Sequence, residues 1–268
     1  MIRNFLLILA VFASFFGAKA SKIDTLSIAT SYLASPENVV VVTPDIAQSR
    51  ACPTVYLLNG YDGNHLQWLS TQPKLPELAD KYGMIFVLPD GRDSWYWNSP
   101  IDPKMQMESL IADRLVEYVD SAYNTIPSPD KRAIAGFSMG GHGAMWLAMH
   151  HPDIWKSAGA MSGGLDIRPF PENWKMKQRI GKKEDDPALW DQYTVINLVP
   201  SLQPGQLNII FDCGTDDFFF DVNNNMHSAL LEAKIPHDYI VRPGGHTHEY
   251  WANALLYQLL FFNEIFNQ

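Results

Sequence analysis

The sequence predicts an α/β fold in which helices cover both faces of a mostly parallel sheet. Short continuous apolar runs recur from residue 54 onward, and such runs are typical of strands buried on both faces. Helical stretches lie between them, and an alternation of strands and helices favours a parallel sheet. A chain of 268 residues with 47% hydrophobic residues can bury one substantial core, and it contains no internal repeat or low-complexity segment. We therefore expect one domain over residues 21–268.

Two short β segments are expected first, at residues 25–33 and 39–43, on either side of the turn Ser35-Pro36-Glu37-Asn38. They are expected to form an antiparallel lead-in to the sheet. The buried strands are predicted at residues 54–59, 84–89, 132–137, 157–161, 207–213 and 237–242. The helices are predicted at residues 76–82, 106–123, 139–151, 223–234 and 249–262. Residues 165–204 are rich in Trp, Pro and charge and break the alternation, which indicates an insertion over the sheet.

Residues 1–20 have the pattern of a signal peptide. Arg3 supplies a positive start, residues 5–16 form an apolar run, and Ala18-Lys19-Ala20 matches a small-x-small cleavage site. The apolar run is shorter than the ~20 residues that a helix needs to cross a bilayer. A lipid anchor needs a cysteine directly after the signal, but the first cysteine is Cys52. We expect a secreted or periplasmic protein without a membrane anchor.

The charge and the cysteines restrict the function further. A net charge of -9 without any Lys/Arg run argues against a nucleic-acid partner, because phosphate binding needs a basic surface. Cys52 and Cys213 cannot form a metal cluster and allow at most one disulfide. The predicted strands place them at opposite ends of the sheet, so we expect two unpaired thiols.

The candidate nucleophile is Ser138, in the G-x-S-x-G sequence Gly136-Phe137-Ser138-Met139-Gly140. Here a predicted strand gives way to a predicted helix, which is the context that this motif requires. Flanking glycines make room for a sharp, strained turn that pushes the serine out of the sheet. The N–H of Met139 begins the helix and is a candidate oxyanion donor. The motif alone also occurs in ordinary βα turns, but the context and the partners below favour a nucleophile.

A serine nucleophile needs a histidine to take its proton and a carboxylate to orient the histidine, in the chain order Ser, Asp or Glu, His. Asp216 and Asp217 follow one predicted strand and His246 follows another, on the side of the sheet where Ser138 lies. From chemistry alone either aspartate could be the acid, and His248 competes with His246. A metal site built from the two histidines and an aspartate is disfavoured, because no further ligand cluster accompanies them. We expect no metal and no cofactor.

The second candidate oxyanion donor is the N–H of Tyr61. It lies in the sequence Leu57-Leu58-Asn59-Gly60-Tyr61-Asp62-Gly63, where an apolar strand ends in a glycine-rich loop.

A second loop, residues 89–97, follows another predicted strand. Asp90, Trp95 and Trp97 are candidates for the wall of an acyl or sugar pocket. The alternative is that these aromatic residues pack beneath the insertion. Trp174 and Trp190 of the insertion have the same two interpretations, and for them packing is favoured.

Five motifs together resemble the putative-esterase family, the group of tributyrin esterases, S-formylglutathione hydrolases, feruloyl esterases and mycolyltransferases. They are Leu57-Leu58-Asn59-Gly60, Val87-Leu88-Pro89-Asp90-Gly91, Gly136-Phe137-Ser138-Met139-Gly140-Gly141, Gly214-Thr215-Asp216-Asp217, and Gly245-His246 with Tyr250-Trp251. The resemblance runs from about residue 25 to the C-terminus and implies the α/β-hydrolase fold. The acid of the family falls on Asp217 and its histidine on His246, and its oxyanion donors fall on Tyr61 and Met139. Asn59 departs from the His or Asp often found before that glycine.

The resemblance implies hydrolysis of a carboxylic ester through an acyl-enzyme, with Ser138 attacking, His246 transferring the proton and Asp217 orienting it. The expected substrates are small-molecule or carbohydrate esters with short-chain acyl or aryl groups. Because export is expected, acetyl or feruloyl esters of carbohydrates are favoured over an intracellular glutathione thioester. One alternative is an acyltransferase of the mycolyltransferase type. The other is a non-catalytic carbohydrate-binding relative, against which the intact set of three residues argues.

Overall fold

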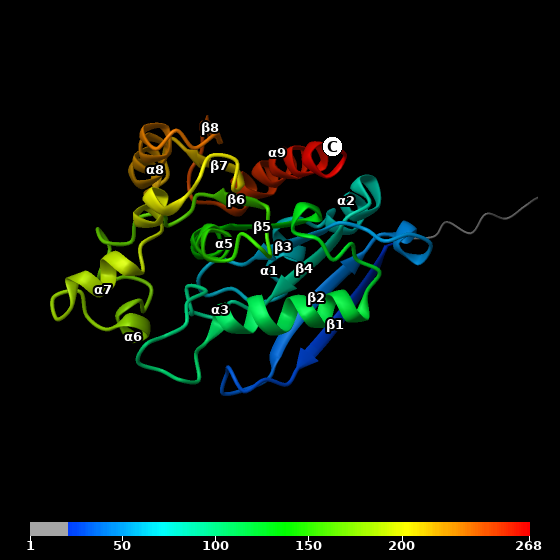
Figure 1. Cartoon of the computed structure of the whole chain (residues 1–268), viewed down its shortest axis with the longest axis horizontal. Helices are drawn as coiled ribbons and strands as arrows, with labels where there is room; N and C mark the ends of the chain where they lie inside the picture. The colour runs from blue at the N-terminus through cyan, green and yellow to red at the C-terminus, as the bar shows by residue number, and fades with distance from the viewer. Residues whose placement is uncertain (1–20) are drawn as a thin grey trace, which may run out of the picture.

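The computed structural model describes residues 21–268, so the predicted signal peptide lies outside the described residues (Figure 1). The described chain forms an eight-stranded sheet with the strand order β1-β2-β4-β3-β5-β6-β7-β8. The β1–β2 and β2–β4 pairs are antiparallel, and the other pairs are parallel. This is the mostly parallel sheet with an antiparallel lead-in that the sequence predicts.

The strands are β1 (Lys22–Ile28), β2 (Glu37–Thr43), β3 (Thr54–Leu58), β4 (Ile85–Pro89), β5 (Arg132–Phe137), β6 (Ser157–Met161), β7 (Asn208–Gly214) and β8 (Asp238–Arg242). The α-helices are α1 (Gln67–Thr71), α2 (Leu75–Tyr82), α3 (Met107–Ser109), α4 (Val116–Ala122), α5 (Met139–His150), α6 (Lys177–Ile180), α7 (Pro187–Gln192), α8 (Phe220–Glu232) and α9 (His248–Phe266). A π-helical segment, Leu110–Leu115, joins α3 to α4. Short 3₁₀ helices lie at Asp45–Gln48, Pro129–Lys131 and Val195–Ser201.

Alternate residues of the buried strands face two separate cores. Val39 and Val41 of β2 lie in one core with residues of α4, α5 and α8. Val40 and Val42 lie in the other core with residues of α2 and α9. Side chains alternate across a strand, so four consecutive valines can all be buried only when helices cover both faces of the sheet.

The element boundaries differ from the predictions in a few places. β1 ends at Ile28, and beyond it Leu33 makes only an isolated bridge to Met105. α8 begins three residues before its predicted start, because the loop turns directly into it where the Phe220 N–H donates to Asp217 O. α9 continues to Phe266, whose side chain is buried in the core. α1 was not expected because it is only five residues long.

The insertion at residues 165–204 contains α6 and α7, which project beyond the end of the sheet in Figure 1. Both cysteines are buried and unpaired, with Cys52 ahead of β3 and Cys213 near the end of β7. No helix between residues 21 and 268 combines the length and the hydropathy needed to cross a bilayer. Because β3, β5, β7 and β8 run parallel, the loops after them meet at one edge of the sheet. That edge carries the candidate site.

Candidate active site

Ser138 occupies a strained turn between β5 and α5. Its backbone has φ 57° and ψ −120°, a conformation that costs a non-glycine residue about 1–3 kcal/mol. The turn packs directly against β3, since a Cβ placed on Gly140 would lie 2.2 Å from the Leu58 carbonyl oxygen. Only glycine fits there. The backbone of β3 and the glycine of the motif therefore hold the serine at the carboxyl edge of the sheet.

The structure brings Ser138, His246 and Asp217 together. His246 Nε2 lies 2.9 Å from Ser138 Oγ, and His246 Nδ1 lies 2.9 Å from Asp217 Oδ2 and 3.1 Å from its Oδ1. A carboxylate only accepts, so the Nδ1 atom carries the proton and Nε2 of the neutral ring is left to accept the serine proton.

The two competing residues lie outside this arrangement. The Asp217 side chain is fully buried, and its Oδ1 also accepts the Phe219 N–H at 2.8 Å. Asp216 is exposed, and its N–H donates to Gly244 O at 2.9 Å. His248 Nδ1 lies 2.8 Å from Thr71 Oγ1, at the start of α9. Between residues 21 and 268 no group of three or more His, Cys, Asp or Glu side chains is arranged to hold a metal ion.

The loop after β3 passes beside the nucleophile. A Cβ placed on Gly60 would lie 3.5 Å from Ser138 Cβ and 2.7 Å from the Phe137 ring. Within the described chain, neither the Tyr61 N–H nor the Met139 N–H donates a hydrogen bond to another protein group. Two backbone donors next to a serine are what an oxyanion hole requires.

His142 supports the serine turn from behind. It is fully buried on α5, and its Nδ1 lies 2.9 Å from Gly164 O. Burial lowers the pKa of His142 to about 4, so the ring is neutral and Nδ1 donates to that carbonyl. The Gly164 N–H in turn donates to Ser138 O at 3.3 Å. These hydrogen bonds connect α5, the loop after β6 and Ser138.

The prediction that Trp95 and Trp97 wall a substrate pocket is wrong. They are 1% and 0% exposed, and they stack on each other 5.6 Å apart and pack against the His142 ring. The Trp95 Nε1–H donates to Trp174 O of the insertion, so these rings are core beneath the insertion.

Asp90 forms hydrogen bonds that stabilise the loop after β4, in which it lies. Its Oδ1 accepts the Arg92 N–H at 3.0 Å, and its N–H donates to the buried Glu37 at 2.7 Å.

The aromatic wall of the site comes from residues that the sequence interpretation passed over or assigned to packing. Phe218 is 51% exposed, and its ring centre lies 4.2 Å from that of His246. Trp174 of the insertion stacks on Phe218 at 5.7 Å with 23° between the planes. Trp190, by contrast, is fully buried. The available signal in the sequence was the Phe218-Phe219-Phe220 run directly after the candidate acid, because three aromatic residues at a strand end place rings near the site.

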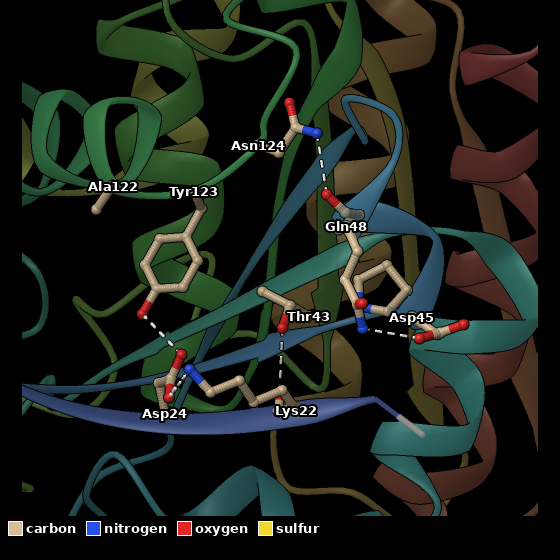
Figure 2. Close-up of a pocket in the computed structure, with 10 residues that line it drawn as sticks. Lys22, Asp24, Thr43, Asp45, Gln48, Ala122, Tyr123 and Asn124 are labelled. Atoms are coloured by element: carbon tan, nitrogen blue, oxygen red, sulfur yellow. Dashed lines mark hydrogen bonds and ion pairs between the residues drawn. The ribbon is translucent and has the colours of Figure 1, made fainter. Parts of the chain in front are cut away.

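One surface pocket lies next to the candidate site, and a larger one lies far from it. One of about 270 Å³ adjoins the loop after β3 and is lined by Tyr61, Asp62, Gly63, Arg92, Asp93 and Lys175. Another of about 410 Å³ lies near the start of β1 and the end of α4 (Figure 2). Its polar groups pair with one another, as in the 2.9 Å ion pair of Lys22 with Asp24. It lies at the opposite edge of the sheet, so its size has no bearing on the chemistry at Ser138.

The sheet topology, the strained serine turn and the polar residues at the carboxyl edge define the class: an α/β-hydrolase-fold protein. Within this class the chain belongs to the putative-esterase family, because residues 30–262 match the family described as "Putative esterase". The family and its relatives place the protein among the carboxylic ester hydrolases.

Two relatives illustrate the match in sequence. An S-formylglutathione hydrolase of Mus musculus is 27% identical over 239 residues, which cover 80% of this chain and 83% of the relative. An acetyl esterase of Caldicellulosiruptor saccharolyticus is 25% identical over 223 residues, which cover 75% and 81%.

Two solved structures illustrate the match in fold. A ferulic acid esterase has a TM-score of 0.78 and 25% identity over 92% of this chain and 99% of its own. An S-formylglutathione hydrolase of Staphylococcus aureus has a TM-score of 0.80 at 18% identity, over 91% of this chain and 100% of its own. The predicted α/β-hydrolase fold and the family resemblance are both confirmed.

Proposed function

We propose that the protein is an exported serine carboxylesterase that hydrolyses short-chain acyl or aryl esters through an acyl-enzyme on Ser138. The observation that carries the proposal is the pair of 2.9 Å contacts made by His246, with Ser138 Oγ on one ring nitrogen and the Asp217 carboxylate on the other. A hydroxyl so placed can lose its proton to the imidazole as it attacks.

In the proposed mechanism, Ser138 Oγ bonds to the ester carbonyl carbon while its proton passes to His246 Nε2. The negative oxygen of the tetrahedral intermediate accepts the Tyr61 and Met139 N–H groups. His246 then protonates the leaving alcohol as the ester C–O bond breaks, and the acyl group stays on the serine. A water molecule, deprotonated by His246, repeats the attack and releases the acid. The Asp217 carboxylate stabilises the imidazolium in both steps. No cofactor takes part.

The favoured substrates are acetyl or feruloyl esters of carbohydrates. An acetyl esterase and a ferulic acid esterase stand among the similar proteins, which supports this choice. The exposed Phe218 ring beside His246, backed by Trp174, offers an apolar face to a planar group. The predicted signal peptide supports a substrate outside the cytoplasm.

The test measures hydrolysis of nitrophenyl acetate, butyrate and octanoate and of methyl ferulate by the parent protein and by Ser138→Ala. We expect Ser138→Ala to lose all four activities and the parent to prefer the shorter or the aryl esters. If Ser138→Ala hydrolyses them as well as the parent, the serine mechanism is wrong. For export, the N-terminus of the protein recovered outside the cytoplasm is sequenced, and it should begin at Ser21.

A further inference from the structure

Asn59 controls the peptide that carries one of the two oxyanion donors. It is 1% exposed, and its Nδ2 donates to the Gly60 carbonyl oxygen at 3.0 Å. In a planar trans peptide the carbonyl of one residue and the N–H of the next point in opposite directions. A bond that fixes Gly60 O therefore also fixes the direction of the Tyr61 N–H. The Gly63 N–H donates to the same oxygen at 3.1 Å.

The orientation of the Asn59 amide is determined by its neighbours. The Gly91 N–H lies 2.8 Å from Asn59 Oδ1 and can only donate, so the oxygen of the amide must face it. The amide nitrogen is then left to face Gly60 O. This side chain connects the loop after β4 with the loop after β3.

Tyr96 holds Asn59 from the other side. Its hydroxyl lies 3.1 Å from Asn59 Oδ1 and 3.0 Å from Asn59 O. Burial raises the pKa of Tyr96 well above its ordinary value, so the group stays a hydroxyl and donates.

The Tyr96 ring is wedged between the loop after β3 and α5. A Cβ placed on Gly143 of α5 would lie 2.2 Å from Tyr96 Cδ2, and Tyr96 itself has φ 62°. A strained backbone and a glycine that makes room for the ring indicate a position that the surrounding structure specifies. α5 carries the Met139 N–H, so one side chain contacts the elements of both oxyanion donors.

We propose that Asn59 and Tyr96 are positioning residues for the oxyanion hole: Asn59 orients the Gly60–Tyr61 peptide, and Tyr96 fixes Asn59. The inference rests on the proposed function. It assigns a role to the asparagine of the Leu57-Leu58-Asn59-Gly60 motif.

The first test compares Tyr96→Phe with Tyr56→Phe. The first substitution removes only the hydroxyl on Asn59 and keeps the ring. Tyr56 of β3 is an equally buried tyrosine whose hydroxyl has no hydrogen-bond partner within the described chain, so Tyr56→Phe is the matched control. Each variant is measured for kcat and KM on nitrophenyl acetate, for the pH profile, and for inhibition by an alkyl trifluoromethyl ketone, which forms a tetrahedral oxyanion on the serine.

Loss of a whole oxyanion donor costs about 10²–10³ in kcat, and a misdirected donor should cost less. We expect Tyr96→Phe to lower kcat about tenfold and to weaken ketone inhibition by the same factor, with KM and the pH profile unchanged. Tyr56→Phe should match the parent. Parental kcat and ketone affinity in Tyr96→Phe would overturn the role of Tyr96.

The second variant is Asn59→Ala, checked for folding by circular dichroism. It should lower kcat about 10²-fold and weaken ketone inhibition in parallel. A folded Asn59→Ala that loses activity but keeps the ketone affinity of the parent would overturn the inference, because the oxyanion hole would then be intact.

The Ser138→Ala result separates the two proposals. If that variant is inactive while the Asn59 and Tyr96 variants match the parent, only this inference fails; if it is active, the proposed function itself fails.

Discussion

The two halves of the catalytic edge are held in different ways. In the half that carries the nucleophile, β3, β4 and β5 are buried along their whole length, and close backbone contacts such as that of Gly140 with Leu58 O fix the turn. In the half that carries the acid and the base, β8 is an edge strand with no fully buried residue. There the loops after β7 and β8 are joined by hydrogen bonds, from Thr215 N–H to Arg242 O and from Asp216 N–H to Gly244 O, and by one close contact, since a Cβ placed on Gly214 would lie 2.2 Å from Gly244 O.

This difference decides which part of the site can be predicted from sequence. A turn fixed by steric contacts leaves glycines at defined positions, and these can be recognised in the sequence. A pair of side chains fixed by the surrounding loops leaves several chemically equal candidates. The turn at Ser138 should accordingly fail by steric clash, and the pair of Asp217 with His246 by loss of a single polar group.

The largest expected effect lies in the acid–base half. Asp217→Asn should lower kcat about 10⁴-fold, because the amide no longer holds His246 in the tautomer that accepts the serine proton. The neighbouring Asp216→Asn should stay within about threefold of the parent, since its side chain is exposed. Ester hydrolysis by both purified variants checks this. Equal losses in the two would contradict the assignment of the acid.

The nucleophile half should be broken by a single methyl group. In Gly140→Ala the added Cβ meets the Leu58 carbonyl oxygen at 2.2 Å, so β3 and the turn must separate. We expect kcat to fall about 10²-fold or more, with a loss of at least about 2 kcal/mol in the free energy of unfolding. Urea unfolding and esterase assays measure the two effects. Gly205→Ala is the control and should keep the activity, because the space around its Cβ is open, although its φ of 79° adds a backbone penalty that Gly140 does not have.

The aromatic wall, Phe218 and Trp174, lies beside His246 in the acid–base half and should affect selectivity more than rate. Phe218→Ala removes an exposed ring beside His246, which we expect to raise KM for methyl ferulate about tenfold. Nitrophenyl acetate is the smaller ester and would lose less contact area with the Phe218 ring, so its KM should change by less than about threefold. An equal change for both esters would indicate disturbance of His246 instead of loss of a substrate contact.

A smaller, pH-dependent effect is expected behind the acid–base half. Asp212 of β7 is fully buried, and burial raises its pKa to about 7. A folded-state pKa above the unfolded value means that folding favours the protonated form of Asp212. The contribution of Asp212 to the free energy of unfolding is therefore fully present below about pH 4 and is lost as the pH rises through about 7. Asp212→Asn mimics the protonated acid. The free energy of unfolding of this variant, relative to that of the parent, should rise by at least about 1 kcal/mol between pH 5 and pH 8. Urea unfolding of the variant and the parent at pH 5 and at pH 8 tests this. An equal difference in the free energy of unfolding at the two pH values would contradict it.

Much of the fold was predictable because burial on both faces leaves continuous apolar runs, as in β2 to β7. The serine turn could be predicted since its glycines are required by contacts below 2.5 Å. The choice of Asp217 and His246 came from the resemblance, because nothing local separates an aspartate that turns inward from one that faces solvent. Trp95 and Trp97 were misassigned because a loop aromatic can face the core or the site, and its direction depends on the insertion above it. Asn59 and Tyr96 were missed as partners because their contact joins loops 37 residues apart.

The most direct test of the central claim, that Ser138 is the nucleophile activated by His246 and Asp217, is covalent labelling. The parent protein and the Ser138→Ala and Asp217→Asn variants are treated with a fluorophosphonate, and the labelled peptide is identified by mass spectrometry. The account predicts one adduct on the peptide that contains Ser138, slower labelling in Asp217→Asn, and no label in Ser138→Ala. An adduct on another residue, or an unlabelled parent that still hydrolyses esters, would contradict it.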